Sequence, residues 1–170
     1  FRKINKILKD PIKGLLPNIQ SLRESLGGFS YISKVDLQNA FWGISVREED
    51  RHILSVTSES HTGGFHYKVL PQGLRSSPAI LTQVMEECLD KISGEVGGRP
   101  IRSHLYSYMD DIFAVSFTKG KEGLREHLQI LEALFGALRA YHMILKLSKC
   151  EFLMRRTMFL GFPIDPEFVY

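Results

Sequence analysis

Short stretches of apolar residues, bounded by glycine, proline or polar residues, divide this chain into segments that predict β-strands. The clearest one alternates polar and apolar positions from Tyr31 to Asp36, so we expect one face of this strand to be buried. The other strand-like stretches are residues 43–46, 53–57, 65–70, 105–109, 112–116, 144–147, 150–154 and 158–162. Two hairpins are predicted among them, one closed by residues 61–64 and one whose turn contains Asp110 and Asp111.

Two longer stretches repeat apolar residues at the three- and four-residue spacing of amphipathic helices. The first is expected to begin with Ser77 as its N-cap and Pro78 at its first helical position. Its apolar residues are Ile80, Leu81, Val84, Met85, Cys88, Leu89 and Ile92, and those of the second are Leu124, Leu128, Leu131, Leu134, Phe135 and Leu138. This order of elements predicts an α+β fold, in which helices pack on one face of a largely antiparallel sheet.

The composition fits one compact domain or two small lobes. Of the 170 residues, 44% are hydrophobic and 24% are charged, so the chain can build a core and is not of the disordered type. No apolar run approaches the roughly 20 residues of a membrane span, and the N-terminus lacks a signal-like segment. We therefore expect no membrane partner. Cys88 and Cys150 match no zinc or CxxC spacing, which predicts free, buried thiols.

Charge is distributed unevenly around a small net value of +3. Residues 1–24 carry six basic groups against two acids, and residues 139–156 carry five against one. Residues 25–138 carry 11 basic and 14 acidic groups. A basic rim around an acidic centre fits a protein that grips a polyanion and holds cations at carboxylates. Ordinary solvated surface charge explains this pattern equally well.

The carboxylates of Asp110 and Asp111 stand in an otherwise uncharged stretch, LYSYMDDIFAVS. Adjacent carboxylates repel each other and lose hydration unless a cation compensates, although an ordinary turn also explains such a pair. If the strand that ends at Asp36 lies beside this hairpin, three carboxylates meet at one end of the sheet. Carboxylate oxygens are the ligands that Mg²⁺ prefers, and two such ions support in-line phosphoryl transfer.

A third motif, LPQGLRSSPA at residues 70–79, joins a predicted strand to a predicted helix. Gly73 allows a ligand to approach the backbone closely, and the Gln72 side chain offers both a donor and an acceptor. Such a turn can bind a phosphate or a sugar on its backbone amides. A plain loop before a capped helix is the alternative interpretation.

Together, these motifs resemble those of the reverse transcriptases of retroviruses and gypsy-like LTR retrotransposons, in the same order and at similar spacing. The central ones are Asp36-Leu37-Gln38-Asn39-Ala40-Phe41, Leu70-Pro71-Gln72-Gly73 and Tyr108-Met109-Asp110-Asp111. Further similar segments are residues 1–5, residues 26–37, Lys149-Cys150-Glu151-Phe152 and Phe159-Leu160-Gly161. The resemblance covers nearly the whole chain.

The resemblance implies a polymerase palm, with an antiparallel sheet backed by helices, and part of the fingers. It assigns residues 1–30 and about 47–72 to the fingers and about 31–46 and 73–165 to the palm. The family's thumb and RNase H regions, and the finger lysine and arginine groups that hold the triphosphate, have no counterpart in these 170 residues. We therefore expect weak polymerase activity from them alone.

The resemblance also implies site residues. Four groups are implied to bind two catalytic Mg²⁺ or Mn²⁺ ions: the carboxylates of Asp36, Asp110 and Asp111 and the backbone carbonyl of Leu37. Contacts with the nucleotide or primer are implied for Phe41, Gln72, Gly73, Tyr108, Met109 and Lys149, and the primer grip for Phe159, Leu160 and Gly161. Phe41 would exclude a 2′-hydroxyl, and Lys149 would lie near the triphosphate; the alternatives are a core aromatic and a surface lysine.

The implied function is an RNA-directed DNA polymerase, in which a primer 3′-hydroxyl attacks the α-phosphate of a dNTP on an RNA or DNA template. Its partners would be the template-primer, the dNTP and the rest of a retroelement polyprotein. Its location would be intracellular, in the cytoplasm, a virus-like particle or the nucleus. Two alternatives stay open: a catalytically weak or domesticated module that binds nucleic acid or protein, and a two-metal nuclease, in which Phe41 and Lys149 would have no purpose.

Overall fold

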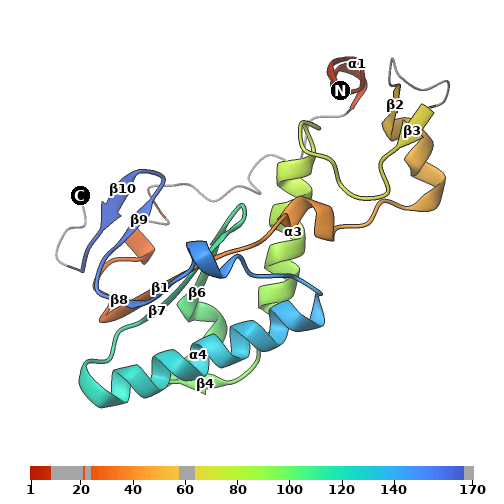
Figure 1. Ribbon diagram of the computed structural model, residues 1–170. Helices are drawn as coiled ribbons and strands as arrows, with labels where there is room; N and C mark the ends of the chain where they lie inside the picture. Colours follow the sequence, from red (N-terminus) through yellow and green to blue (C-terminus); the bar gives the residue numbers. More distant parts are fainter. Residues whose placement is uncertain (9–20, 22–23, 58–63, 167–170) are drawn as a thin grey trace.

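The computed structural model describes residues 1–8, 21, 24–57 and 64–166 (Figure 1). The α-helices are α1 (Arg2–Ile7), α3 (Ser77–Asp90) and α4 (Gly120–Ala140), and the 3₁₀ helices are η1 (Ala40–Gly43), η2 (Glu48–Leu54), η3 (Ile101–His104) and η4 (Leu147–Lys149). The strands are β1 (Tyr31–Asp36), β2 (Ser55–Thr57), β3 (Gly64–His66), β4 (Glu95–Val96), β5 (Arg99–Pro100), β6 (Leu105–Tyr108), β7 (Asp111–Ser116), β8 (Glu151–Met154), β9 (Thr157–Phe159) and β10 (Phe162–Ile164).

Four strands form the central antiparallel sheet, in the order β6-β7-β1-β8. Strand β1 therefore lies between the β6–β7 hairpin and β8, although these segments are far apart in the sequence. Figure 1 shows the small β9–β10 hairpin at one side of this sheet, with β2, β3 and α1 at the other side. The predicted α+β fold with a largely antiparallel sheet is confirmed.

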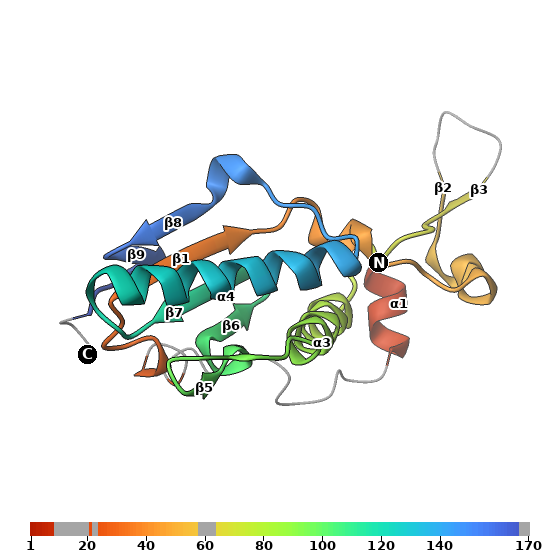
Figure 2. The same ribbon diagram turned by 90° about the horizontal axis from the view of Figure 1, so that it is seen from below.

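One face of the sheet packs against α3 and α4; in Figure 2, α4 runs across the strands and α3 lies beside β6. Val35, Ile112 and Ala114 point to this face and belong to a buried cluster with residues of both helices, among them Leu81, Met85, Leu89, Ile130 and Leu134. Burying each large apolar side chain contributes roughly 1.5–3 kcal/mol, so this layer holds the sheet flat against the helices. Among the helices that the structure describes, none combines the length and apolar character needed to cross a bilayer.

The opposite face of the sheet is covered at one end by a smaller apolar cluster. Ile32, Phe113 and Val115 of β1 and β7 pack there with Leu26, Phe29, Phe159 and Ile164. Phe159 belongs to β9, so this cluster fixes the β9–β10 hairpin onto the sheet. The other end of the same face carries Lys34, Asp36 and Asp111, because strand side chains alternate between faces.

Two local predictions were wrong. Ser76, not Ser77, is the N-cap of α3, and the Ser77 hydroxyl donates to the Pro71 carbonyl at 2.7 Å, so it ties the preceding turn to the helix. Residues 158–162 form a hairpin turn instead of one strand. Leu160 and Gly161 both have positive φ values, 49° and 82°, as a two-residue type I′ turn requires, and Phe159 pairs with Phe162 across it.

The two predicted hairpins have different outcomes. Residues 105–116 form the hairpin β6–β7, and Asp111 is already the first residue of β7. Strands β2 and β3 pair as an antiparallel hairpin, but residues 58–63 of its predicted loop lie outside the described residues. The extended stretches 43–46 and 144–147 are reduced to isolated bridges, Ser45 with Val69 and Leu145 with Leu37.

A buried histidine joins α4 to the sheet. The ring of His127 contacts the hydroxyls of Ser33 on β1 and Ser116 on β7, at 2.8 and 3.1 Å. Ser33 also accepts a hydrogen bond from the backbone N–H of Leu153 on β8, at 3.0 Å. Burial, together with the smaller effect of the nearby His104, lowers the pKa of His127 to about 4. The ring is therefore neutral at neutral pH.

The neutral state of His127 predicts a loss of stability in weak acid. The folded chain excludes a proton that the unfolded chain binds below its pKa of 6.5, so stability is complete above that pH and falls as pH drops toward 4. We expect a loss of roughly 2 kcal/mol at about pH 4.5. Urea unfolding at neutral pH and at about pH 4.5 measures this loss of stability, with His127→Gln as the comparison. Equal pH dependence in the two proteins would contradict the prediction.

Candidate active site

The three predicted carboxylate residues meet at one end of the central sheet. Asp36 is the last residue of β1, and it lies directly opposite Asp111, the first residue of β7, in the antiparallel register. Asp110 occupies the turn before Asp111, and its carbonyl accepts a hydrogen bond from the N–H of Leu37 at 3.2 Å. This bond closes the end of the sheet, so the backbones of all three aspartates are held next to one another.

The turn of the β6–β7 hairpin sets the position of Asp110. Tyr108 pairs with Asp111, which leaves Met109 and Asp110 as the two turn residues. Met109 has a φ of 58°, a left-handed value that is uncommon for residues other than glycine. Because Asp110 has no positive φ, Met109 and Asp110 do not form a type I′ turn. The turn exposes the Asp110 side chain at the rim of the sheet.

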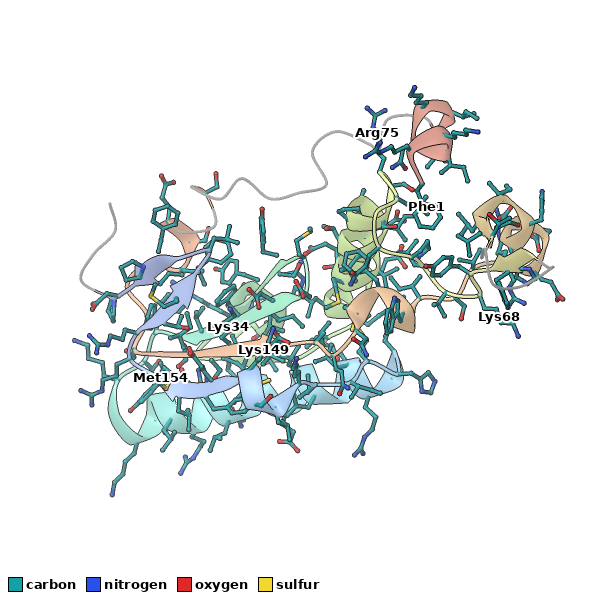
Figure 3. The ribbon with its side chains drawn as sticks, turned by 45° about the horizontal axis from the view of Figure 1, so that its top comes forward. Phe1, Lys34, Lys68, Arg75, Lys149 and Met154 are labelled. Atoms are coloured by element: carbon teal, nitrogen blue, oxygen red, sulfur yellow. The ribbon has the colours of Figure 1, made fainter. Side chains whose placement is uncertain are left out.

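Two lysines compensate the negative charge of these carboxylates. The Lys34 Nζ lies 3.0 Å from Asp111 Oδ2, and the side chains are only 21% and 18% exposed. The Lys149 Nζ lies 3.7 Å from Asp36 Oδ2, and the Lys149 side chain is 58% exposed. Figure 3 shows both lysines over the sheet. The first ion pair is shorter and better shielded from water, so it is the stronger of the two.

Asp111 experiences opposing influences on its charge. Burial raises the pKa of Asp111 above the ordinary value of an aspartate, and the nearby carboxylates of Asp110 and Asp36 raise it further. The hydrogen bond and the positive charge of Lys34 lower it. The site is thus one in which a cation favours the ionised form of a carboxylate that burial and like charges disfavour.

Cys150 and the segment before it hold Asp36 in place from the other side. The Asp36 N–H donates to Cys150 Sγ at 3.4 Å, and the Asp36 carbonyl accepts from the Lys146 N–H at 2.9 Å. Cys88 and Cys150 are both free, as predicted. Cys88 is also buried, as predicted, whereas Cys150 is only partly buried. Its position beside Asp36 gives the Lys149-Cys150 motif a direct structural link to the site.

The residues present fit a divalent cation in chemistry and in backbone position. Three carboxylates with hard oxygen donors stand at one end of the sheet, as Mg²⁺ sites require. Within the described residues, however, no three His, Cys, Asp or Glu side chains are gathered into a group that could hold a metal ion. In this structure the Asp36 and Asp111 carboxylates are instead paired with the ammonium groups of Lys149 and Lys34.

The predicted primer-grip residues are connected to the β6–β7 hairpin through aromatic packing. Tyr108 and Phe113 each contact the ring of Phe159 edge to face, with ring centroids 5.3 Å apart in both pairs. Leu160 and Gly161 form the exposed turn next to Phe159. The structure therefore connects the β9–β10 hairpin to the strand that precedes Asp110 and Asp111.

Other predicted site residues lie in different surroundings. Phe41, in η1, is partly buried and packs against the core cluster of α3 and α4. Gln72 and Gly73 are exposed, and the Gly73 carbonyl accepts a hydrogen bond from the Asn5 side chain at 2.9 Å. Asn5 Oδ1 also accepts from the Arg75 N–H at 2.9 Å. The 70–76 turn is thus joined to the N-terminal segment, as Phe1 and Arg75 illustrate in Figure 3.

Sequence reasoning missed two groups that act on the carboxylates. Lys34 is two residues before Asp36, so the alternation of the strand already indicated that both side chains share a face. Cys150 was noticed only as part of a motif, and no local pattern indicates that its sulfur contacts the backbone of Asp36.

A third connection supports the β6–β7 hairpin from the helix side. Ser107, next to Tyr108, donates to Glu86 Oε1 on α3 at 2.6 Å. Arg102 contacts the other oxygen of Glu86 and donates to Asp90 Oδ1 at 2.7 Å and to the Leu105 carbonyl at 2.9 Å. These contacts fasten β6 to α3 just before the Tyr108-Met109-Asp110-Asp111 segment.

Comparison with known proteins identifies relatives along almost the whole chain. Residues 1–164 match the family model described as reverse transcriptase (RNA-dependent DNA polymerase). The chain is 31% identical over 168 residues to the retrovirus-related Pol polyprotein from transposon 297 of Drosophila melanogaster, and 29% identical over 167 residues to the transposon Tf2-3 polyprotein of Schizosaccharomyces pombe. Each alignment covers 98% of this chain, but only 14% and 11% of the two polyproteins.

A solved structure has a similar fold. It is that of the foamy viral protease-reverse transcriptase in complex with an RNA/DNA hybrid, with a TM-score of 0.78 and 29% sequence identity. The match covers 97% of this chain and 20% of that chain. The similarity confirms that the α+β arrangement is that of the fingers-palm region of this family.

Removal of Lys34 should raise the pKa of Asp111 still further. Lys34→Met deletes the hydrogen bond and the positive charge that stabilise the ionised carboxylate, while the burial and the neighbouring acids stay. A ¹³C NMR titration of the Asp111 carboxyl, without divalent ions, measures the change. Lys68→Met removes the same charge from an exposed position and should leave the pKa unchanged. A lower Asp111 pKa in Lys34→Met would show that this account of the site is wrong.

Proposed function

This chain belongs to the reverse transcriptase (RNA-dependent DNA polymerase) family, and on that basis we propose that it forms the nucleotidyl-transfer site of such a polymerase. The observation that carries the proposal is the meeting of three aspartates at one end of the sheet. Asp36 lies opposite Asp111, and the Asp110 carbonyl accepts a hydrogen bond from the Leu37 N–H. The reaction would extend a primer 3′-hydroxyl by attack on the α-phosphate of a dNTP, with release of pyrophosphate.

Asp36, Asp110 and Asp111, with the backbone carbonyl of Leu37, would hold Mg²⁺ or Mn²⁺. Two such ions, when bound, supply the positive charge that stabilises the attacking and leaving oxygens of phosphoryl transfer. The protein's own contribution is positioning. The pairing of β1 with β7 fixes the backbone positions of the carboxylate residues against a packed core, which limits the rearrangement left to their side chains.

Neighbouring residues supply the substrate contacts in this proposal. Tyr108 and Met109 precede the carboxylates on the hairpin and would face the primer terminus, with Phe159, Leu160 and Gly161 beside them. Lys149 already lies at the carboxylates, and its exposed ammonium can reach the triphosphate and donate a proton to the leaving pyrophosphate. Gln72 and Gly73 would contact the nucleotide from the turn that leads into α3.

The substrate surface follows from the relatives and from the charge. One relative was solved in complex with an RNA/DNA hybrid, so we propose a template-primer duplex as the partner of this chain as well. The basic residues at both ends of the sequence would contact its phosphates, and such contacts weaken steeply with salt. Because the chain spans a small part of its relatives' length, the rest of a polyprotein would supply further contacts.

The proposal is tested by Asp110→Asn in a single-nucleotide incorporation assay with a labelled primer-template, dNTP and Mg²⁺ or Mn²⁺. The side chain is exposed, so the variant should fold. We expect incorporation to fall roughly a hundredfold or more, since charge stabilisation of the transition state is lost. Glu122→Gln removes one exposed negative charge from α4 and should retain activity.

Fluorescence anisotropy of the same labelled duplex separates the alternatives. Binding by the wild-type chain without any incorporation, unaffected by Asp110→Asn, would favour a binding module and contradict the polymerase. Shortening of the labelled strand that requires Asp110 would favour a nuclease. Incorporation that depends on Asp110, with duplex binding unchanged, supports the proposal.

Phe41→Val tests the proposed selection against ribonucleotides. In the proposal, the aromatic ring meets the sugar and leaves no room for a 2′-hydroxyl; valine would open that space. The partly buried position tolerates a smaller apolar side chain, because Phe41 lies at the edge of the core. We expect the preference for dNTP over rNTP to fall by about tenfold or more, equivalent to about 1.4 kcal/mol. An unchanged ratio of incorporation efficiencies would mean that Phe41 acts only in packing.

A further inference from the structure

Lys34 is held against the candidate metal site more firmly than a surface lysine would be. Its ammonium lies 3.0 Å from Asp111 Oδ2, and its Nζ lies 5.9 Å from the centre of the Phe113 ring. The long side chain is covered for most of its length, because only 21% of it is exposed. Figure 3 shows Lys34 over the central strands, far from Lys68.

The sheet register explains why Lys34 reaches Asp111. Lys34 lies opposite Phe113 on β7, and Asp111 is two residues earlier on the same face. Diagonal neighbours on antiparallel strands are within reach of a long side chain. On the other side of β1, Lys34 lies opposite Glu151 of β8 in the strand register. The Glu151 carboxylate accepts a hydrogen bond from the Thr157 hydroxyl at 2.6 Å. Glu151 is thus engaged elsewhere, and the ammonium is directed to Asp111.

The Lys34 ammonium and a divalent metal ion can each offset the negative charge of the same carboxylate, that of Asp111. Asp111 lies directly opposite Asp36 and next to Asp110, so three negative charges are close together at this end of the sheet. Lys34 offsets this repulsion while no metal is bound. An ion that binds the Asp111 oxygen held by Lys34 must displace the ammonium, and one that binds the other oxygen meets the repulsion of the nearby positive charge, so in either case Lys34 weakens the binding of the metal.

Lys149 does not have the same effect. Its ammonium is 3.7 Å from Asp36 and its side chain is 58% exposed, so water already screens the attraction and the side chain can move away freely. The difference in exposure between the two lysines indicates that Lys34 is the one whose displacement costs free energy.

We propose that Lys34 is a positioning residue that competes with divalent metal for Asp111 and thereby weakens the metal affinity of the site until substrate phosphates contribute ligands of their own. The inference rests on the proposed function, because it requires Asp111 to be a metal ligand. It deepens that function by naming a residue of this chain that makes tight metal binding depend on the nucleotide.

Mn²⁺ binding to the 170-residue chain, without nucleotide, tests the inference directly. Electron paramagnetic resonance counts the free ion, so the readout does not require catalysis. Lys34→Met keeps the length of the side chain and deletes its charge, and we expect Mn²⁺ to bind about fivefold or more tightly, as couplings between ligands typically do. Lys34→Arg keeps the charge and should bind no more tightly than wild type. Lys68→Met is the control for net charge and should show no change.

Asp111→Asn separates the failure of the inference from the failure of the proposed function. If Mn²⁺ binding depends on Asp111 but is unchanged or weaker in Lys34→Met, the metal site stands and the role of Lys34 is overturned. If neither wild type nor Lys34→Met shows binding that Asp111→Asn removes, the metal site itself is overturned, and the inference with it. Circular dichroism of each variant shows whether it has folded.

A second measurement uses only the wild-type protein, so it is independent of variant folding. Lysine acetylation followed by mass spectrometry reports how accessible each ammonium is. In the proposal, addition of Mg²⁺ releases Lys34 from Asp111 and increases its rate of labelling by a fewfold, whereas Lys68 is unaffected. Labelling of Lys34 that stays constant up to metal concentrations that occupy the site would overturn the proposal.

Discussion

Mutual repulsion among three carboxylates at the end of one sheet is the constraint on which this structure depends. Asp36 and Asp111 face each other across two antiparallel strands, and Asp110 occupies the adjoining turn. Burial makes the repulsion more costly, as the raised pKa of Asp111 shows. Folding such an arrangement requires compensating cations, and the described structure supplies them through Lys34 and Lys149. In the proposed function, the same unfavourable arrangement is what would allow the site to bind divalent ions.

The two faces of the central sheet divide the work of holding this arrangement. The face toward α3 and α4 is apolar and fully packed, apart from the hydroxyl and imidazole contacts around His127. The opposite face is apolar at one end and charged at the other. Because neighbouring side chains on a strand point to opposite faces, Val35 anchors β1 in the core while Lys34 and Asp36 remain at the site. Rigidity on one side therefore supports chemistry on the other.

Aromatic packing connects the site to the β9–β10 hairpin. Phe159 contacts both Tyr108 and Phe113, which flank Asp110 and Asp111 along the β6–β7 hairpin. Through these directly packed rings, a movement of the β9–β10 hairpin would thus displace the residues that flank the carboxylates. This physical continuity favours the proposal that the hairpin and the carboxylates handle the same substrate, with the primer end held between them.

The sequence by itself determined the local elements and the chemistry of the site. The alternation from Tyr31 to Asp36, the apolar spacing of α4 and the hairpin around Asp110 follow from backbone periodicity, and each is found in the structure. Carboxylates in an apolar stretch predicted a cation site. The sequence did not fix the first residue of α3. Ser76 and not Ser77 is its N-cap, and the two adjacent serines differ only in tertiary contacts, such as the hydrogen bond of Ser77 to Pro71.

Tertiary structure alone decided which partners the charges have. No local pattern relates Lys34 to Asp111 or Cys150 to Asp36, since each contact joins strands that are distant along the chain and depends on register. A shift of one residue between β1 and β7 would turn Lys34 away from Asp111 and separate the carboxylates. Residue types therefore indicated the chemistry of the site. Which side chains meet was determined by strand direction and register, and these are properties of the packed sheet.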